Sequence, residues 1–150
     1  MSLPPAGPEP AKQTDLFGCH PELVKRVTAF LIACSRQGLA LRVTESRRSA
    51  ERQAWLYSIG RTKSHPQTGS EKTVTNAAAG KSNHETGRAI DVAPMRPSKL
   101  GTPDFAPQTW YDTPFWPQIA SIGKQCGLVW GGDFRMIHDL PHFELPEDVV

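Results

Sequence analysis

The stretch that decides the fold is SNHETGRAID, residues 82–91. It joins a polar loop to a short apolar segment, residues 89–93, whose composition favours a β-strand. His84 lies in the loop and Asp91 in the strand. Gly87 stands between them and permits the turn that brings an imidazole and a carboxylate toward one point. We therefore predict a functional loop that leads directly into a strand.

A second imidazole follows near the end of the chain, in DLPHFE, residues 139–144. Catalytic zinc takes three protein ligands with N or O donors and keeps one position for water. His84, Asp91 and His142 meet that need, and the spacing is not the HExxH of a helical zinc site. Asp139, three residues before His142, is a candidate base for a metal-activated water. Two histidines and one carboxylate also suit non-haem iron, so spacing alone leaves both metals open.

Hydrophobic periodicity on both sides of these motifs predicts the rest of the fold. The expected helices cover residues 21–37, residues 49–58, and a segment that opens at Thr113-Pro114 and ends at Gly127. The expected strands, besides 89–93, are residues 39–44, 128–130 and 143–145. Residues 61–83 and 94–113 are expected to be loops. The sum is an α+β fold, in which about three helices pack on a small, mostly antiparallel sheet.

Length and composition limit the classes of protein to consider. The 150 residues suit one domain. Residues 1–15 hold four of the fourteen prolines. We expect them to form a flexible tail ahead of a catalytic domain over residues 16–150. A net charge of +2 is too small to indicate nucleic acid binding. We expect no membrane insertion and no secretory signal, because no apolar run has the necessary length or flanks.

The three cysteines give no sign of a thiolate metal site or a redox pair. Cys19, Cys34 and Cys126 are far apart, and no CxxC spacing occurs. Cys34 and Cys126 fall at apolar positions of helical patterns, which predicts buried free thiols. We therefore expect the chain to be made in a reducing compartment.

At these motifs the sequence resembles the family of D-Ala-D-Ala carboxypeptidases and L-alanyl-D-glutamate peptidases, within the group that includes the hedgehog signalling domain. The family pattern SxHxxGxAxD is met over residues 82–91, and an acidic residue with a second histidine is met at Asp139 and His142. Further agreement comes from RSxxxQ at 48–53, GRTK at 60–63, VTNA at 74–77 and WGGDF at 130–134. The aromatic residue that commonly precedes the family arginine is absent here. The register of Ser49 and Gln53 favours Arg48 over Arg47 as that arginine.

The resemblance implies one zinc ion on His84, Asp91 and His142, with Asp139 as base. It also implies that Arg48 lies near the substrate carbonyl, where an arginine would stabilise an oxyanion. Ser82 either orients the loop or hydrogen-bonds the substrate, and the alternative role for Asp139 is to cap a turn. A set of basic residues is expected to border the site and attract substrate carboxylates: Arg61, Lys63, Lys81 and Arg88.

The function implied is hydrolysis of the peptide stem of bacterial peptidoglycan at the L-Ala–D-Glu bond, by a monomer acting as a phage-type endolysin. Alternatives are a D-Ala-D-Ala carboxypeptidase or dipeptidase, and a zinc-bearing binding module without catalysis. The presence of both Asp139 and Arg48 argues against the binding module. Without a signal, the protein would be made in the host cytoplasm and reach the wall after a membrane lesion. An injected antibacterial toxin would look similar.

Overall fold

The computed structural model describes residues 2–97, 103–105 and 114–150. The helices are α1 (Pro21–Arg36), α2 (Ala50–Ser58) and α3 (Trp116–Gln125), with a short 3-10 turn, η2, at Gly131–Asp133. The strands are β1 (Leu41–Glu45), β2 (Ala89–Pro97), β3 (Pro103–Phe105), β4 (Val129–Trp130) and β5 (His142–Glu144). The antiparallel sheet has the order β1-β2-β5-β4, and β3 pairs with β2. The predicted α+β class is confirmed.

The ends of the helices follow from local sequence. Helix α1 starts with Pro21 in its first turn, and α2 is capped by the preceding Ser49, whose side chain accepts a hydrogen bond from Arg52 N at 3.1 Å. Helix α3 begins at Trp116, later than predicted, and Pro117 rather than Pro114 occupies its first turn. Gly127 ends it with a φ of 81°, a backbone conformation that favours glycine. Thr113 lies outside the described residues.

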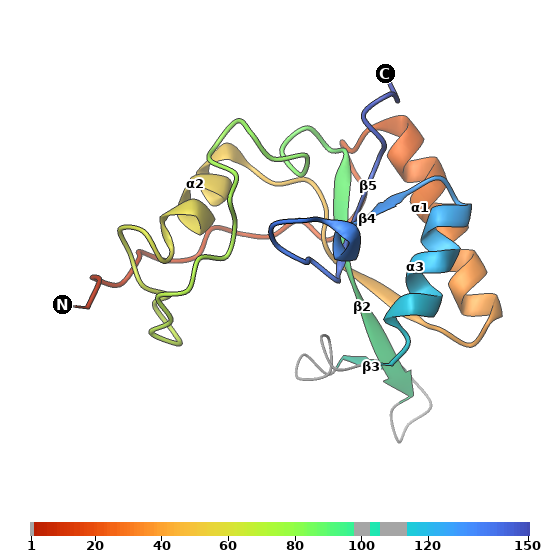
Figure 1. Cartoon of the computed structure of the whole chain (residues 1–150), viewed down its shortest axis with the longest axis horizontal. Coiled ribbons are helices and arrows are strands. Elements are labelled where there is room, and N and C mark those ends of the chain that lie inside the picture. Colours follow the sequence, from red (N-terminus) through yellow and green to blue (C-terminus); the bar gives the residue numbers. More distant parts are fainter. Residues whose placement is uncertain (1, 98–102, 106–113) are drawn as a thin grey trace.

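The core lies between the sheet and two of the helices. Helices α1 and α3 run side by side on one face of the sheet, whereas α2 lies apart on the other side (Figure 1). The rings of Phe30 and Phe143 have centroids 4.7 Å apart, so they join α1 to β5. The largest fully buried apolar side chains of this core are Leu23, Val27, Phe30, Ile90, Val92, Ile119 and Phe143. Cys19 and Cys34 are buried as free thiols, and Cys126 is half-buried.

Strand alternation separates a core face of the sheet from a polar face. Ile90 pairs with Phe143, and both side chains are buried in the core. Neighbouring residues in a strand point to opposite faces, so Asp91 and His142, the next pair, point away from α1 and α3. Glu45 pairs with Asp91 across a β-bulge in β1. The register therefore sets Glu45, Asp91 and His142 in one row across three strands.

The loop predicted over residues 94–113 is wrong in part. Residues 94–97 continue β2, and residues 103–105 form β3 against it, while the remaining residues lie outside the described part. The loop had been predicted from the proline content of this segment. Pro97 and Pro103 pair at the end of the ladder, where a missing N–H costs little, so proline does not exclude this edge pairing.

The first residues of the chain run along α2 and the loop after it. Ala6 N donates to Ser64 O at 2.9 Å, and the Trp55 Nε1–H donates to Gly7 O at 2.9 Å. Glu9 pairs with Arg52 at 2.9 Å. Composition did not indicate these contacts, and the mobility of residues 1–15 stays a prediction.

Among the described residues, the helices all lack the length and apolarity that crossing a membrane requires.

Candidate metal centre and catalytic cleft

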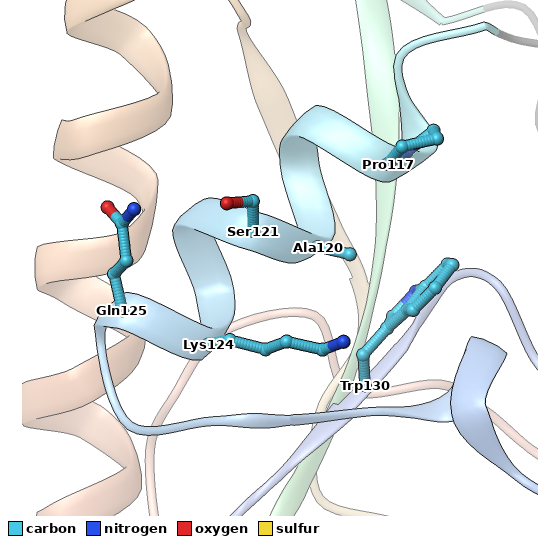
Figure 2. A pocket seen from close by; sticks show the side chains of 6 residues that line it. All are labelled: Pro117, Ala120, Ser121, Lys124, Gln125 and Trp130. Carbon is cyan, nitrogen blue, oxygen red and sulfur yellow. The ribbon is translucent and has the colours of Figure 1, made fainter.

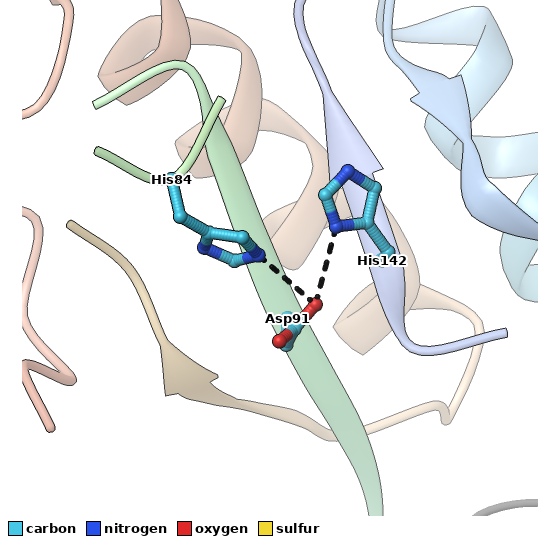
Figure 3. Close-up of side chains that lie close together, drawn as sticks. All are labelled: His84, Asp91 and His142. Atoms are coloured by element: carbon cyan, nitrogen blue, oxygen red, sulfur yellow. Dashed lines mark ion pairs between the residues drawn. The ribbon is translucent and has the colours of Figure 1, made fainter. Parts of the chain in front are cut away.

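Three predicted ligand side chains converge on the polar face of the sheet (Figure 3). His84 Nε2 lies 3.5 Å from Asp91 Oδ1, and His142 Nδ1 lies 3.4 Å from the same oxygen. One ligand atom from each of the three residues falls within 4.8 Å of the other two. Asp91 and His142 are neighbours across β2 and β5, and His84 approaches from the loop before β2. The structure thus brings together the three groups that the sequence motifs singled out.

The loop that carries His84 is held by backbone geometry. Gly87 has a φ of 71°, and a Cβ at this position would lie 2.9 Å from Cys19 Cα, so the turn requires glycine. The Arg48 N–H donates to the His84 carbonyl oxygen at 3.0 Å. His84 and His142 are 4% and 7% exposed, which leaves their rings little freedom.

Each imidazole has its outer nitrogen engaged and its inner nitrogen turned toward Asp91. His84 Nδ1 lies 2.8 Å from the Ser46 carbonyl oxygen, an acceptor that fixes the proton on Nδ1. His142 Nε2 lies 3.1 Å from Glu144 Oε2, which fixes the proton on Nε2 in the same way. The inner atoms, His84 Nε2 and His142 Nδ1, then carry lone pairs in the neutral form. Such outer hydrogen bonds are characteristic of metal-ligating histidines.

The donor set fits a divalent cation. Asp91 Oδ1 is buried and lacks a hydrogen-bond donor among the described residues. A buried acceptor without a partner is costly and calls for an explanation, which a cation beside it supplies. Two imidazole nitrogens and one carboxylate oxygen are the ligand types that zinc takes in hydrolytic sites.

The electrostatics of the three groups agree with that fit. Burial alone would raise the pKa of Asp91, yet His84 and His142 hold it well below its ordinary value. Burial alone would lower the pKa of His142, yet contacts with Asp91 and Glu144 raise it to about 10. The site therefore stabilises positive charge at its centre, and a metal ion must displace a proton from His142 to bind.

The predicted base and serine lie on the walls around this cluster. Asp139 Oδ2 is 3.8 Å from His142 Nδ1, and the Asp139 side chain is 42% exposed. Partial burial and the charge of Asp91 raise the pKa of Asp139, which makes it a better proton acceptor. The half-buried Ser82 lines the same cleft, and its Oγ accepts a hydrogen bond from His84 N at 3.2 Å. This bond fits the loop-orienting role, and the substrate-binding role of Ser82 stays a prediction.

Arg48 reaches the cluster from the opposite side. Its Nη2 lies 3.8 Å from Asp91 Oδ2 and 2.7 Å from Glu45 Oε1. Its Nε donates to Glu45 Oε2 at 3.1 Å, and its Nη1 donates to Gln53 Oε1 at 2.9 Å. The three hydrogen bonds to Glu45 and Gln53 use three of the five N–H groups of the guanidinium, and among the described residues one N–H on each terminal nitrogen has no hydrogen-bond acceptor.

The cluster opens into a cleft of about 610 Å³. The loop before His84 lines one part of it, including Val74 and Lys81, and the loop before Asp139 lines another part, including Arg135 and Met136. The Lys81 and Arg135 side chains are exposed and make no salt bridge or hydrogen bond with another described residue. The wall of the cleft therefore carries two positive charges that are unpaired within the described part of the chain.

Of the four basic residues expected at the border, Lys81 lines the cleft. Arg61 donates to Tyr57 O and Thr75 O and stacks at 3.7 Å on the Tyr57 ring, which holds the loop together. Arg88 donates to Pro146 O at 2.8 Å, and Lys63 is not among the residues that line the cleft. His138, next to Asp139 in the sequence, has its Nδ1 2.9 Å from Gly132 O.

The roles of three glutamates near the cleft were not predicted from the sequence. Glu144 holds His142, Glu45 holds Arg48, and Glu85 accepts hydrogen bonds from Gly80 N and Ser82 N in the loop. The sequence did contain an indication for Glu144, because residues two apart in a strand, here His142 and Glu144, point to the same face of the sheet. Glu45 had no such signal, since the bulge in β1 changes the register there.

A second hollow, of about 530 Å³, lies between α3 and Trp130 (Figure 2). Trp130 pairs with Phe143 across β4 and β5, so the two side chains belong to the same face of the sheet. That face is the one covered by α1 and α3, opposite His142. The sheet therefore separates this hollow from the metal cluster, and the cleft is the candidate active site.

Comparisons with known proteins agree with this assignment. The family described as D-alanyl-D-alanine carboxypeptidase matches residues 75–145, a range that includes His84, Asp91, Asp139 and His142. The peptidoglycan L-alanyl-D-glutamate endopeptidase CwlK of Bacillus subtilis is 32% identical over 131 residues, which cover 84% of this chain and 72% of that protein.

Solved structures show the same architecture. The L-Ala D-Glu endopeptidase ChiX of Serratia marcescens superposes with a TM-score of 0.58 at 28% identity, over 87% of this chain and 83% of that one. The D,D-pentapeptidase VanY of a VanB-type resistance cassette, in complex with Zn(II), gives 0.58 at 12% identity, over 97% and 86%. At that identity the second likeness concerns the fold.

Proposed function

We infer the function from the premise that the chain belongs to the family of D-alanyl-D-alanine carboxypeptidases and L-alanyl-D-glutamate peptidases, metallopeptidases of bacterial peptidoglycan. We propose that it hydrolyses the L-Ala–D-Glu bond of the peptide stem with one zinc ion. The observation that carries the proposal is the set of three donors around Asp91 Oδ1, with both outer imidazole nitrogens already engaged.

His84, Asp91 and His142 would hold the zinc. When bound, zinc lowers the pKa of a water molecule and polarises a carbonyl group. The residues of the chain then divide the remaining work between them. Asp139 takes the proton of the attacking water on one side of the cluster and gives it to the leaving amine of D-Glu. The raised pKa of Asp139 suits both steps. The carboxylate accepts the proton of the water more readily, and the carboxylic acid that forms can then donate this proton to the amine.

Arg48 supports the reaction from the other side of the cluster. Attack on the amide places negative charge on the carbonyl oxygen, and a guanidinium with free N–H groups stabilises that charge. The Arg48 side chain is 9% exposed and held by Glu45 and Gln53, so it needs little reorganisation during the reaction. Ser82 remains a proposed substrate contact at the lip of the cleft.

The entrance charges favour an anionic peptide. A stem that carries γ-linked D-Glu has a free α-carboxylate next to the scissile bond, and further carboxylates follow along the stem. Lys81 and Arg135, which line the cleft from two different loops, would attract these groups. The choice of the L-Ala–D-Glu bond rests on the two endopeptidases that the chain resembles, CwlK and ChiX.

The test is digestion of purified disaccharide-pentapeptide muropeptides, with the products identified by mass. The proposal expects a free peptide that begins with D-Glu, formed by zinc-loaded protein and lost after chelation. Release of D-Ala alone would establish a carboxypeptidase instead, and a protein that binds zinc and muropeptide without cleavage would be a binding module. The Asp139→Asn variant is the matched control, because it should keep zinc and lose turnover.

We propose further that the site of action is the cell wall and that the protein serves in lysis, as a monomer. Lysis of cells in suspension after addition of the protein to permeabilised bacteria, with the Asp139→Asn variant inactive, would support this role. A protein that trims isolated stems without reducing the turbidity of such cells would be a wall-modifying enzyme.

A further inference from the structure

Glu45 is a buried carboxylate beside the metal cluster that the mechanism above does not use. Its side chain is 6% exposed, and the β1–β2 register sets it next to Asp91. A β-bulge in β1 places it there, and bulges commonly redirect a side chain toward a site. Two carboxylates in adjacent positions repel each other unless a cation lies near both. The Arg48 guanidinium contacts both carboxylates.

Both oxygens of Glu45 are occupied by arginines. Arg48 contacts Oε1 at 2.7 Å and Oε2 at 3.1 Å, a bidentate arrangement that fixes both the position and the plane of the guanidinium. Arg52 contacts the same two oxygens at 3.3 Å and 2.5 Å. Glu45 is therefore not available as a metal ligand. It acts on the cluster through Arg48.

The network ends at the surface, away from the cleft. Arg52 extends from Glu45 to Glu9, at 2.9 Å, in the first segment of the chain. Glu9 is 35% exposed, and it contacts Arg52 rather than Arg48. Both glutamates of this network therefore contact Arg52. Glu45 also holds Arg48, the arginine that faces the metal cluster.

We propose that Glu45 is a positioning residue for the hydrolysis, and this inference rests on the function proposed above. It holds the Arg48 guanidinium so that the remaining N–H groups face the cleft, where the oxyanion forms. A rigid donor that is already oriented stabilises a developing charge more than a mobile one. Removing the charge of Glu45 frees Arg48 to turn toward Asp91, 3.8 Å away, and lowers turnover without removing a metal ligand.

The experiment compares Glu45→Gln with Glu9→Gln, the same chemical change at the two ends of one network. We expect E45Q to lower kcat about tenfold or more with KM nearly unchanged, since loss of an oxyanion donor costs about 10² to 10³. E9Q should keep kcat within about twofold of wild type, as expected for a partly exposed ion pair. Zinc content is measured for each protein and should equal that of wild type.

A double-mutant cycle separates positioning from a general structural effect. In an Arg48→Lys background, E45Q should lower kcat by less than about twofold, because its effect passes through Arg48. An equal loss in both backgrounds overturns the inference, and so does wild-type kcat for E45Q or for Arg48→Lys. If E45Q does not fold, the cycle is run with Glu45→Asp, which keeps the charge and withdraws the carboxylate, and the same non-additivity is required. A wild-type protein that cleaves no muropeptide overturns the proposed function together with this inference.

Discussion

The most informative single substitution is Glu144→Ala. Glu144 Oε2 accepts the hydrogen bond of His142 Nε2 at 3.1 Å, and its side chain is 15% exposed. This contact orients the ring so that Nδ1 faces Asp91. Removal of such an outer partner typically lowers metal affinity about 10- to 100-fold, or about 1.4 to 2.8 kcal/mol. We expect a loss of zinc affinity in that range with the fold unchanged.

The loss should depend on pH, with a sign that follows from the contacts of His142. Glu144 also helps to raise the pKa of His142 to about 10, and the proton on His142 competes with the metal. Without Glu144 that proton leaves more easily, which offsets part of the loss near neutral pH. We therefore expect about a tenfold loss at about pH 7 and a loss closer to 100-fold at about pH 9.

The assay is competition for zinc with a chromophoric chelator, at both pH values. Glu144→Gln keeps an acceptor oxygen and should lose less affinity than Glu144→Ala. Asn83→Ala removes a 2.6 Å hydrogen bond to the same Oε2 but leaves the His142 contact, so it controls for disturbance of Glu144. Zinc affinity of Glu144→Ala within about twofold of wild type at both pH values would refute the reasoning.

Three further predictions concern other parts of the molecule. Lys81→Ala with Arg135→Ala should raise KM for stem peptides, and added salt should reduce the difference from wild type, as steady-state kinetics will show. Gly123→Ala should lower the free energy of unfolding in urea by about 1 to 3 kcal/mol, since its Cβ would lie 2.7 Å from Phe143 Cε2. Burial raises the pKa of Glu45, but Arg48 and Arg52 outweigh it and lower the pKa. Its contribution to stability is thus present above the ordinary carboxyl pKa, and acid titration of unfolding should show it lost as pH falls through the lowered value.

The sequence predicted the helices and the central strands because their signals are local. Apolar spacing and end residues such as Pro21 and Gly127 determine where α1 and α3 run. The motifs around His84 and His142 also identified the three groups of the metal cluster, since each carries a distinctive side chain. Strand β3 was missed because its pairing with β2 is an interaction between segments, and proline content gave the opposite indication.

The supporting groups of the site were harder to predict. Ser46 acts through its backbone carbonyl, which any residue supplies, so its identity carries no signal. Glu45 contacts Arg48 because of the β-bulge in β1, and Arg135 lines the cleft because of the path of the loop before Asp139. These relations depend on tertiary geometry. The contacts of Glu9 with Arg52 likewise join segments far apart in the chain, and proline-rich composition pointed away from them.

The central claim, that two imidazoles and one carboxylate share a catalytic zinc, is tested most directly by anomalous diffraction at the zinc edge from crystals of the zinc-loaded protein. We predict one strong peak at about 2.0 to 2.2 Å from His84 Nε2, His142 Nδ1 and Asp91 Oδ1. A zinc-loaded crystal with no peak among these three atoms, or with its strong peak bound elsewhere, would contradict the account.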